Sequence, residues 1–281
     1  MVPARMSPAV AILVLVLVNT VTVTAMLLLR RWAPEGSYFR DTQQAAGVFT
    51  VAGTAYAVLL AFVFLLAFQS YNSARTAAEQ EATAITALYH DADSFPQPAQ
   101  TLLHGELTCY GRAVVTAEWP AMEAGHSSPR VQDWIDRLDA TFDDSHPTTP
   151  KEQSADDNWI ALTAQGLEGR RGRLQEAEPL VPGLVWALLI IGSVVVVGFV
   201  TLFADRGERA FVQATLMLSV TTMLVAGLVM IKFFDDPYAD HGGSIKPDAM
   251  RRTLVTLAAR PSGRAVRPPC TAQGPPLRLT A

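Results

Sequence analysis

Acidic side chains gather near the end of the sequence, where they could bind a cation. Asp235, Asp236 and Asp240 supply carboxylate oxygens, the ligands that calcium and other hard cations take. Such a cluster also ends helices at membrane surfaces, and Pro237, directly behind Asp236, favours this second interpretation. We therefore predict no metal site here.

Imidazole and carboxylate groups occur together in one further segment, at His90, Asp91, Asp93, His104 and Glu106. Zinc sites on helices commonly use two histidines four residues apart, on one helix face. No pair of histidines in this segment has that spacing. The segment therefore does not predict a zinc site.

Positive charge is concentrated at Arg170, Arg171 and Arg173. These residues could attract anions or acidic head groups, but we favour the simpler role of anchoring a helix end at the membrane interface. Glycines recur every three residues in the same segment, at Gly166, Gly169 and Gly172. No strand precedes them, so they predict close packing or a bend in a helix rather than a dinucleotide-binding loop.

The residue pattern predicts neither catalysis nor nucleic-acid binding. No nucleophile stands beside a base, so we predict neither an enzyme nor a bound cofactor. The basic residues are too few and too scattered for a nucleic-acid interface.

Hydrophobicity is the dominant signal, since half of the 281 residues are apolar and only 17% are charged. Four stretches of 22 residues or more lack Asp, Glu, Lys and Arg, and about 20 residues suffice to span a bilayer. We predict an all-α membrane protein with spans at about 9–29, 46–69, 180–204 and 210–231. The resulting regions are a first transmembrane hairpin at 1–69, an acidic helical soluble domain at 70–179, a second hairpin at 180–232 and a polar tail at 233–281.

The soluble domain shows helical periodicity throughout. Pro96-Gln97-Pro98 should break the first helix, and a second helix should run from about Ala99 until Pro120 stops it. A third helix is predicted from Pro129 to Phe142 and a loop from Asp143 to Lys151. Helical pattern resumes from Asn158 to Glu178. The five residues between the last two spans predict an antiparallel helix hairpin.

The second span continues into the soluble domain without a helix breaker. Gly53 to Pro96 encloses 42 residues, which predicts one rod about 63 Å long. Gly53, Ala57 and Ala61 share one side and would let a neighbouring helix approach closely. The opposite side carries Val51, Val58, Phe62, Leu66 and Gln69. This stripe is typical of lipid-facing or core packing, but rings of Val58, Phe62 and Leu66 from several subunits would also make a hydrophobic gate.

Several motifs resemble a known family in their order along the chain. They are "YAVLLAF" within Gly53 to Phe68, "QSYNSA", the Glu81-Ala82 pair, "EWP" at Glu118 to Pro120, "RRGRL" at Arg170 to Leu174, Trp186, and "DDPY" at Asp235 to Tyr238. From Gly47 to Pro247 the sequence resembles the bestrophin-like family of bacterial membrane proteins. In the last motif the family usually has Asp-x-Pro-Phe.

The resemblance implies distant similarity to bestrophins, pentameric anion channels with four spans per subunit and a pore lined by the second span. It implies a homo-oligomer in the lipid bilayer of the bacterial cell membrane, with small anions as partners and Val58, Phe62, Leu66 and Gln69 lining the pore. Both termini and the 70–179 domain would be cytoplasmic. The thinned acidic cluster at Asp235, Asp236 and Asp240 speaks against calcium gating. A membrane-anchored helical sensor or scaffold, binding a ligand or a protein through 70–179, is the alternative.

The end of the chain offers little pattern. Cys109 and Cys270 are the only cysteines, and a pair so far apart does not predict a disulfide framework or an oxidising compartment. The Pro- and Arg-rich end from Arg260 has no apolar period, so we expect it to be disordered.

Overall fold

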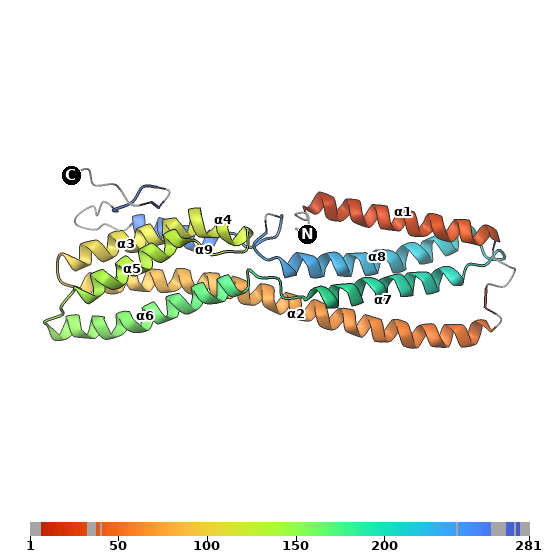
Figure 1. Ribbon diagram of the computed structural model, residues 1–281, viewed down its shortest axis with the longest axis horizontal. Coiled ribbons are helices and arrows are strands. Elements are labelled where there is room, and N and C mark those ends of the chain that lie inside the picture. Colours follow the sequence, from red (N-terminus) through yellow and green to blue (C-terminus); the bar gives the residue numbers. More distant parts are fainter. Residues whose placement is uncertain are drawn as a thin grey trace. The chain divides into compact units, whose positions relative to one another are not determined.

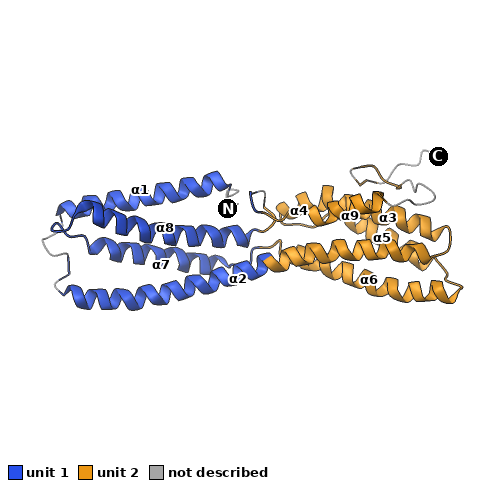
Figure 2. Cartoon of the chain, turned by 180° about the vertical axis from the view of Figure 1, so that it is seen from behind, with its two compact units in different colours: residues 1–71, 179–236, 240–243 blue, residues 72–178, 237–239, 244–281 orange. Residues whose placement is uncertain are grey.

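The computed structural model describes residues 7–32, 38–39, 41–239, 241–259, 268–272 and 274–275. Within these ranges the regular elements are helices and no strand occurs, which confirms the all-α prediction. The chain divides into two compact units, coloured blue and orange in Figure 2. Unit 1 comprises residues 1–71, 179–236 and 240–243, and unit 2 comprises residues 72–178, 237–239 and 244–281.

Unit 1 holds the apolar helices. These are α1 (Pro8–Trp32), the first part of α2 (Thr42–Asp91), α7 (Gly183–Leu202) and α8 (Ala210–Asp235). Each is long and apolar enough to cross a membrane, as the four-span prediction requires. Helices α1, α7 and α8 run beside one another in Figure 1.

Polar contacts fix the order of the helices in unit 1. The Asn19 side chain of α1 accepts a hydrogen bond from Thr222 of α8 at 3.2 Å. Arg30, near the end of α1, donates to the carbonyls of Asp205 and Arg206 in the loop between α7 and α8, at 3.0 and 3.2 Å. Hydrogen bonds of this kind hold helices together inside a membrane, where water cannot replace the partner.

Helix α2 is unbroken over 50 residues. A short 3-10 turn (Ala92–Ser94) follows it, and the chain then turns at the cis Gln97–Pro98 bond. The predicted continuation of the second span into the polar segment is therefore confirmed. Residues up to Tyr71 belong to unit 1, and those from Asn72 belong to unit 2.

Unit 2 is a bundle built on the rest of α2. Its other elements are α3 (Ala99–Ala113), a π-helical turn (Val114–Glu118), α4 (Trp119–Glu123), α5 (Pro129–Asp143), α6 (Pro150–Gln175) and α9 (Asp248–Ala258). Trp134, Leu103, Leu107 and Val131 are among its fully buried side chains. Helix α9 was not among the predicted elements.

Two helix boundaries differ from prediction. Pro120 does not stop the helix, because it lies in the first turn of α4, where the missing N–H has no helical partner to lose. Helix α6 begins at Pro150 rather than at Asn158, since Thr149 and Glu152 form a reciprocal capping box that starts the helix there. The predicted loop from Asp143 to Lys151 is correspondingly shorter.

The expectations for the cysteines and the tail were wrong where the structure describes them. Cys109 of α3 forms a disulfide with Cys270 across a separation of 161 residues. Residues 268–272 and 274–275 are accordingly seated on unit 2 instead of lacking structure. Sequence distance carries no information about such a pair, because the fold alone brings the two thiols together. The other residues from 260 on lie outside the described ranges.

Candidate functional site

Helix α2 carries the predicted pore-lining side chains on a face that its own chain leaves exposed. Val58, Phe62 and Leu66 are 65%, 59% and 39% exposed, and Gln69 is exposed as well. Their spacing of three or four residues places them in one stripe along the helix. The stripe is therefore available to lipid, water or another copy of the chain.

The small residues predicted to admit a neighbouring helix lie on another side of α2 from this stripe. Ala57 and Ala61 are exposed, and a Cβ added at Gly53 would meet no atom within 4 Å. The described part of the chain thus places no helix against Gly53. Helix packing at these three positions and pore lining at the stripe both stay predictions.

The buried face of α2 is a different one. Tyr56, Val63 and Ala67 are buried, and the Tyr56 hydroxyl donates to the Leu189 carbonyl of α7 at 2.8 Å. Any Cβ at Gly192 would clash with the Tyr56 ring, so the glycine allows α7 to lie close to α2. This packing turns Val58 and Phe62 away from the rest of unit 1.

Asp235 closes the end of α8 and is only 2% exposed. Its Oδ1 accepts from the Val181 N–H at 2.8 Å, and its Oδ2 accepts from Nε1 of Trp186 at 3.3 Å. Asp236 instead pairs with Lys232 one turn earlier, at 2.5 Å. Asp235 therefore joins the end of α8 to the start of α7, whereas the pair of Asp236 stays within α8. No trio of potential metal ligands forms among the described residues, and Asp240 lies outside them.

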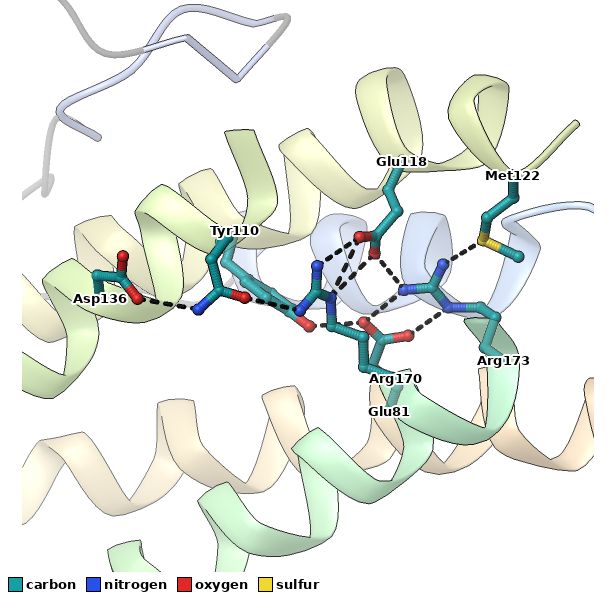
Figure 3. A network of polar contacts seen from close by, with 8 residues as sticks. Glu81, Tyr110, Glu118, Met122, Asp136, Arg170 and Arg173 are labelled. Carbon is teal, nitrogen blue, oxygen red and sulfur yellow. Dashed lines mark hydrogen bonds and ion pairs between the residues drawn. The ribbon is translucent and has the colours of Figure 1, made fainter. Parts of the chain in front are cut away.

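Unit 2 encloses a buried ion-pair network that the sequence pattern did not predict (Figure 3). Arg173 of α6 is 0% exposed, with Nε 2.7 Å from Oε2 of Glu81 on α2. The same guanidinium places Nη2 2.6 Å from Oε2 of Glu118, which is also fully buried. A buried charge is tolerated only when it is paired and hydrogen-bonded, and Arg173 meets both conditions.

A second arginine extends the network towards α5. Arg170 Nη2 lies 2.7 Å from Oε1 of Glu118, and Arg170 Nη1 donates to the Gln132 side chain at 3.1 Å. Gln132 in turn donates to Asp136 at 2.9 Å. Figure 3 shows Arg170, Glu118 and Arg173 close together, and the Tyr110 hydroxyl donates to Glu81 at 2.6 Å. Two carboxylates balance two guanidiniums at the centre, so the buried cluster carries no net charge.

The electrostatics of the network keep its groups charged. Burial alone would raise the pKa of Glu118, but hydrogen bonds from Arg170 and the positive charge of Arg173 lower it. Burial is the largest single effect on the pKa of Arg173 and lowers it, but the charges and hydrogen bonds of Glu81, Glu118 and Tyr110 together outweigh burial and raise the pKa. Burial and the nearby Glu81 charge raise the pKa of Tyr110 well above its ordinary value, so its hydroxyl remains a donor. The cluster is suited to locking helices together, not to proton transfer.

Gly169 allows the helices that carry the ion-pair network to pack closely. A Cβ at Gly169 would lie 2.7 Å from the Glu81 backbone nitrogen, which confirms close packing as the role of the glycine series at this position. Trp119 seals the same region, since its Nε1 donates to the Ile245 carbonyl at 3.0 Å and the Arg173 guanidinium lies 5.1 Å from its ring centre.

Interface anchoring is therefore the wrong role for two of the three arginines. Arg170 and Arg173 are buried in unit 2, whereas Arg171 is exposed. The spacing held a signal: positions three residues apart share a helix face, so Arg170 and Arg173 point the same way and Arg171 does not. What the sequence could not supply was the pair of acids, 52 and 92 residues away, that meets them.

The histidine and acid group of residues 90–106 also forms contacts within the protein. His104 stacks on Tyr89 at 4.1 Å, with Nε2 3.0 Å from the Tyr89 carbonyl and 3.3 Å from Asp93 Oδ1. Glu106 faces α5 instead, where Thr141 hydrogen-bonds it and Arg137 attracts it. The structure thus splits the group between two neighbourhoods.

Comparison with known proteins shows similarity to one family over most of the chain. Residues 16–250 match the family model of the Bestrophin-like domain. The crystal structure of a bacterial Bestrophin homolog from Klebsiella pneumoniae is 14% identical with a TM-score of 0.61, covering 89% of this chain and 98% of that one. A point variant of the Klebsiella protein is 15% identical with a TM-score of 0.60, at 89% and 97% coverage. None of the curated proteins matches the sequence.

Proposed function

The chain belongs to the bestrophin-like family, and on this premise we propose that it forms an oligomeric membrane channel lined by α2. Val58, Phe62, Leu66 and Gln69 would line the pore. The observation that supports this role is their exposure opposite the face by which α2 packs on its own chain.

The stripe has the chemistry of a hydrophobic gate. Several copies would bring rings of Val58, Phe62 and Leu66 around one axis, with the Gln69 amides at the end of the apolar section. A narrow apolar ring expels water, so an ion crosses only when the ring widens. Phe62 is the bulkiest member and would set the constriction.

Assembly would use the flank of α2 that carries the small residues, on another side from the stripe. Gly53, Ala57 and Ala61 present little side-chain volume, which allows a helix of another copy to come close. The flank is open in the described chain, as such an interface requires before assembly. The number of copies follows by analogy only, and the analogy suggests five.

The protein would lie in the bacterial cell membrane. The family resemblance implies that both termini and residues 70–179 are in the cytoplasm. Permeation of small anions has the same basis. The charge of the soluble domain favours cations over anions. Residues 70–179 contain 18 acidic and 8 basic side chains, a net charge of about −10. If that surface lined the entrance, it would concentrate cations.

Flux from reconstituted liposomes tests the proposal, with chloride and potassium gradients measured in parallel. Phe62→Ala should change the flux, because it removes the largest side chain of the ring. Phe211→Ala is the matched control, since Phe211 is 81% exposed on α8 and outside the stripe. Background flux from wild type and Phe62→Ala alike would reject the channel, and the ion carried would decide between anions and cations.

A groove in unit 2 supports the second candidate, a membrane-anchored sensor or scaffold. It lies between α2 and α9, has a volume of about 670 Å³ and is lined by Thr83, Thr86, His90, Arg252, Thr253 and Thr256 among others. This function needs no ring of subunits. A monomer or dimer mass from light scattering in detergent would favour it, whereas a fivefold mass would favour the channel.

A further inference from the structure

The described tail residues bind to a site formed by α3 and α5, called their seat below. We call residues 268–272 and 274–275 the strap. Cys270 of the strap is joined to Cys109 of α3 by the disulfide, and the Trp134 Nε1 of α5 donates to the Gly274 carbonyl at 2.9 Å. Trp134 is only 1% exposed, so the strap carbonyl satisfies a donor buried in the core of unit 2.

Gly274 fits the seat in two ways. Its φ of +87° suits glycine, and a Cβ there would lie 2.9 Å from the Ala113 backbone nitrogen. The strap also folds on itself, since the Gly274 N–H donates to the Thr271 carbonyl at 3.0 Å. A segment packed this closely against a helix is docked specifically.

Among the described residues, few side-chain hydrogen bonds hold the strap in place. Besides the Trp134 bond, Arg112 Nη1 donates to the Thr271 carbonyl at 3.3 Å. Ordering a segment of this length costs more conformational entropy than a few hydrogen bonds return. The disulfide therefore decides whether the strap stays seated.

The surroundings of the disulfide favour reversible thiol chemistry. Arg112 Nη1 lies 3.8 Å from Cys270 Sγ. A guanidinium beside a sulfur stabilises the thiolate, which is the reactive form of cysteine. A cationic neighbour and a second cysteine close by are two features of redox-sensing pairs. The third is solvent access, which release of the strap would supply, since Cys109 and Cys270 are only 0% and 5% exposed in the bonded state.

We propose that Cys109 and Cys270 form a redox switch that seats and releases the strap, with Arg112 activating Cys270 each time the reduced strap returns to its seat. Disulfides in the cytoplasm are seldom permanent and are commonly redox-sensing. The proposal rests on the cytoplasmic placement of unit 2 given above, and it is independent of whether the protein conducts ions.

The chemistry balances with a peroxide as the oxidant and a dithiol as the reductant. The Cys270 thiolate attacks a peroxide oxygen, giving a sulfenic acid and releasing water after proton uptake. The Cys109 thiol then displaces the second water as the S–S bond forms. In the reverse direction one thiolate of the dithiol opens the bond, its second thiol resolves the mixed disulfide, and both cysteines recover their protons.

The role of Arg112 is tested on the reduced full-length protein in detergent, by following the loss of maleimide-reactive thiols after peroxide is added. Arg112→Gln should slow disulfide formation, because the amide keeps a donor for the Thr271 carbonyl but has no charge. Arg112→Lys should retain much of the rate, and Arg130→Gln, at an exposed arginine of α5, should match wild type. Equal rates in Arg112→Gln and wild type would overturn the role of Arg112.

Strap release is tested through the reactivity of Cys109, which is 0% exposed in the bonded state. After reduction, Cys109 in Cys270→Ser should react with maleimide as fast as in a chain that ends at Arg267. A markedly slower reaction in Cys270→Ser would show that the strap stays seated without the bond, and would overturn the switch.

In cells, the Cys109–Cys270 cross-linked peptide should appear after peroxide treatment and disappear on recovery. Its quantitative presence in untreated cells would identify a permanent structural disulfide instead.

Discussion

Arg173 and Glu81 meet where neither side chain reaches solvent, with Nε of α6 2.7 Å from Oε2 of α2 and Nη2 2.9 Å from Oε1. This two-point contact joins the long helix to the helix that leads back to the membrane-spanning segments. Glu118 adds a third point from the π-helical turn. Since burying charge is costly, the benefit of the arrangement is one fixed register of α2 against α6.

Removing the central arginine should destabilise unit 2 strongly. Arg173→Met leaves Glu81 and Glu118 buried without their shared partner, and breaking a buried pair in this way costs about 3 to 5 kcal/mol. Thermal unfolding of the full-length protein in detergent should show a clear drop in melting temperature. Arg171→Met, at the exposed neighbour, should change stability by no more than about 0.5 kcal/mol. Similar melting temperatures for the two variants would contradict the assigned roles.

Two glycines of α6 should respond to alanine with opposite signs. Gly169→Ala puts a Cβ 2.7 Å from the Glu81 backbone, which cannot yield, so the helices must separate and stability falls. At Gly166 the nearest atom is the Ala84 Cβ at 3.4 Å, an ordinary contact. Gly166→Ala should therefore gain up to about 1 kcal/mol from helix propensity. The paired unfolding curves check this, and a stabilised Gly169→Ala would refute the close approach.

Acid should weaken unit 2 through Glu118. The pKa of this carboxyl is lower in the folded state than its ordinary value of 4.5, so the folded state binds its proton less readily than the unfolded state. Its stabilising contribution is full above the unfolded pKa and is lost as pH falls through the folded pKa. Glu118→Gln should be less stable than wild type at pH 7, and the gap should narrow below about pH 4.5. A gap that stays constant with pH would count against the buried charge.

Asp235 at the end of α8 should act by joining α8 to α7. Asp235→Asn replaces one acceptor with an NH₂ group that faces a donor, either Val181 N–H or Trp186 Nε1, so the melting temperature of unit 1 should fall. Asp236→Asn should cost less, because its pair with Lys232 is 19% and 28% exposed. Calcium should leave the melting temperature of wild type unchanged. Stabilisation by calcium that disappears in Asp235→Asn would restore the cation site.

Much of the architecture could be predicted because apolar length and helix breakers act locally. A run such as Leu180 to Ala204 has no soluble alternative, and Pro96 and Pro98 end α2 wherever the rest of the chain lies. Errors arose where a local signal was weak. Pro120 is a breaker only in a helix interior, and it occupies a first turn. Thr149 and Glu152 have the spacing of a capping box, but the prolines at 147 and 150 favoured a loop in the same segment.

The amino-acid sequence by itself determined four apolar helices, one unbroken helix from span to polar segment, and the order of motifs that places the chain in its family. These follow from composition and spacing along a single helix. Only the tertiary structure decided that Arg170 and Arg173 neutralise Glu118 and Glu81, that Asp235 joins α7 to α8, and that Cys270 returns to Cys109. Each of these contacts joins residues between about 50 and 160 positions apart, and chain closure over such distances leaves no periodicity to detect.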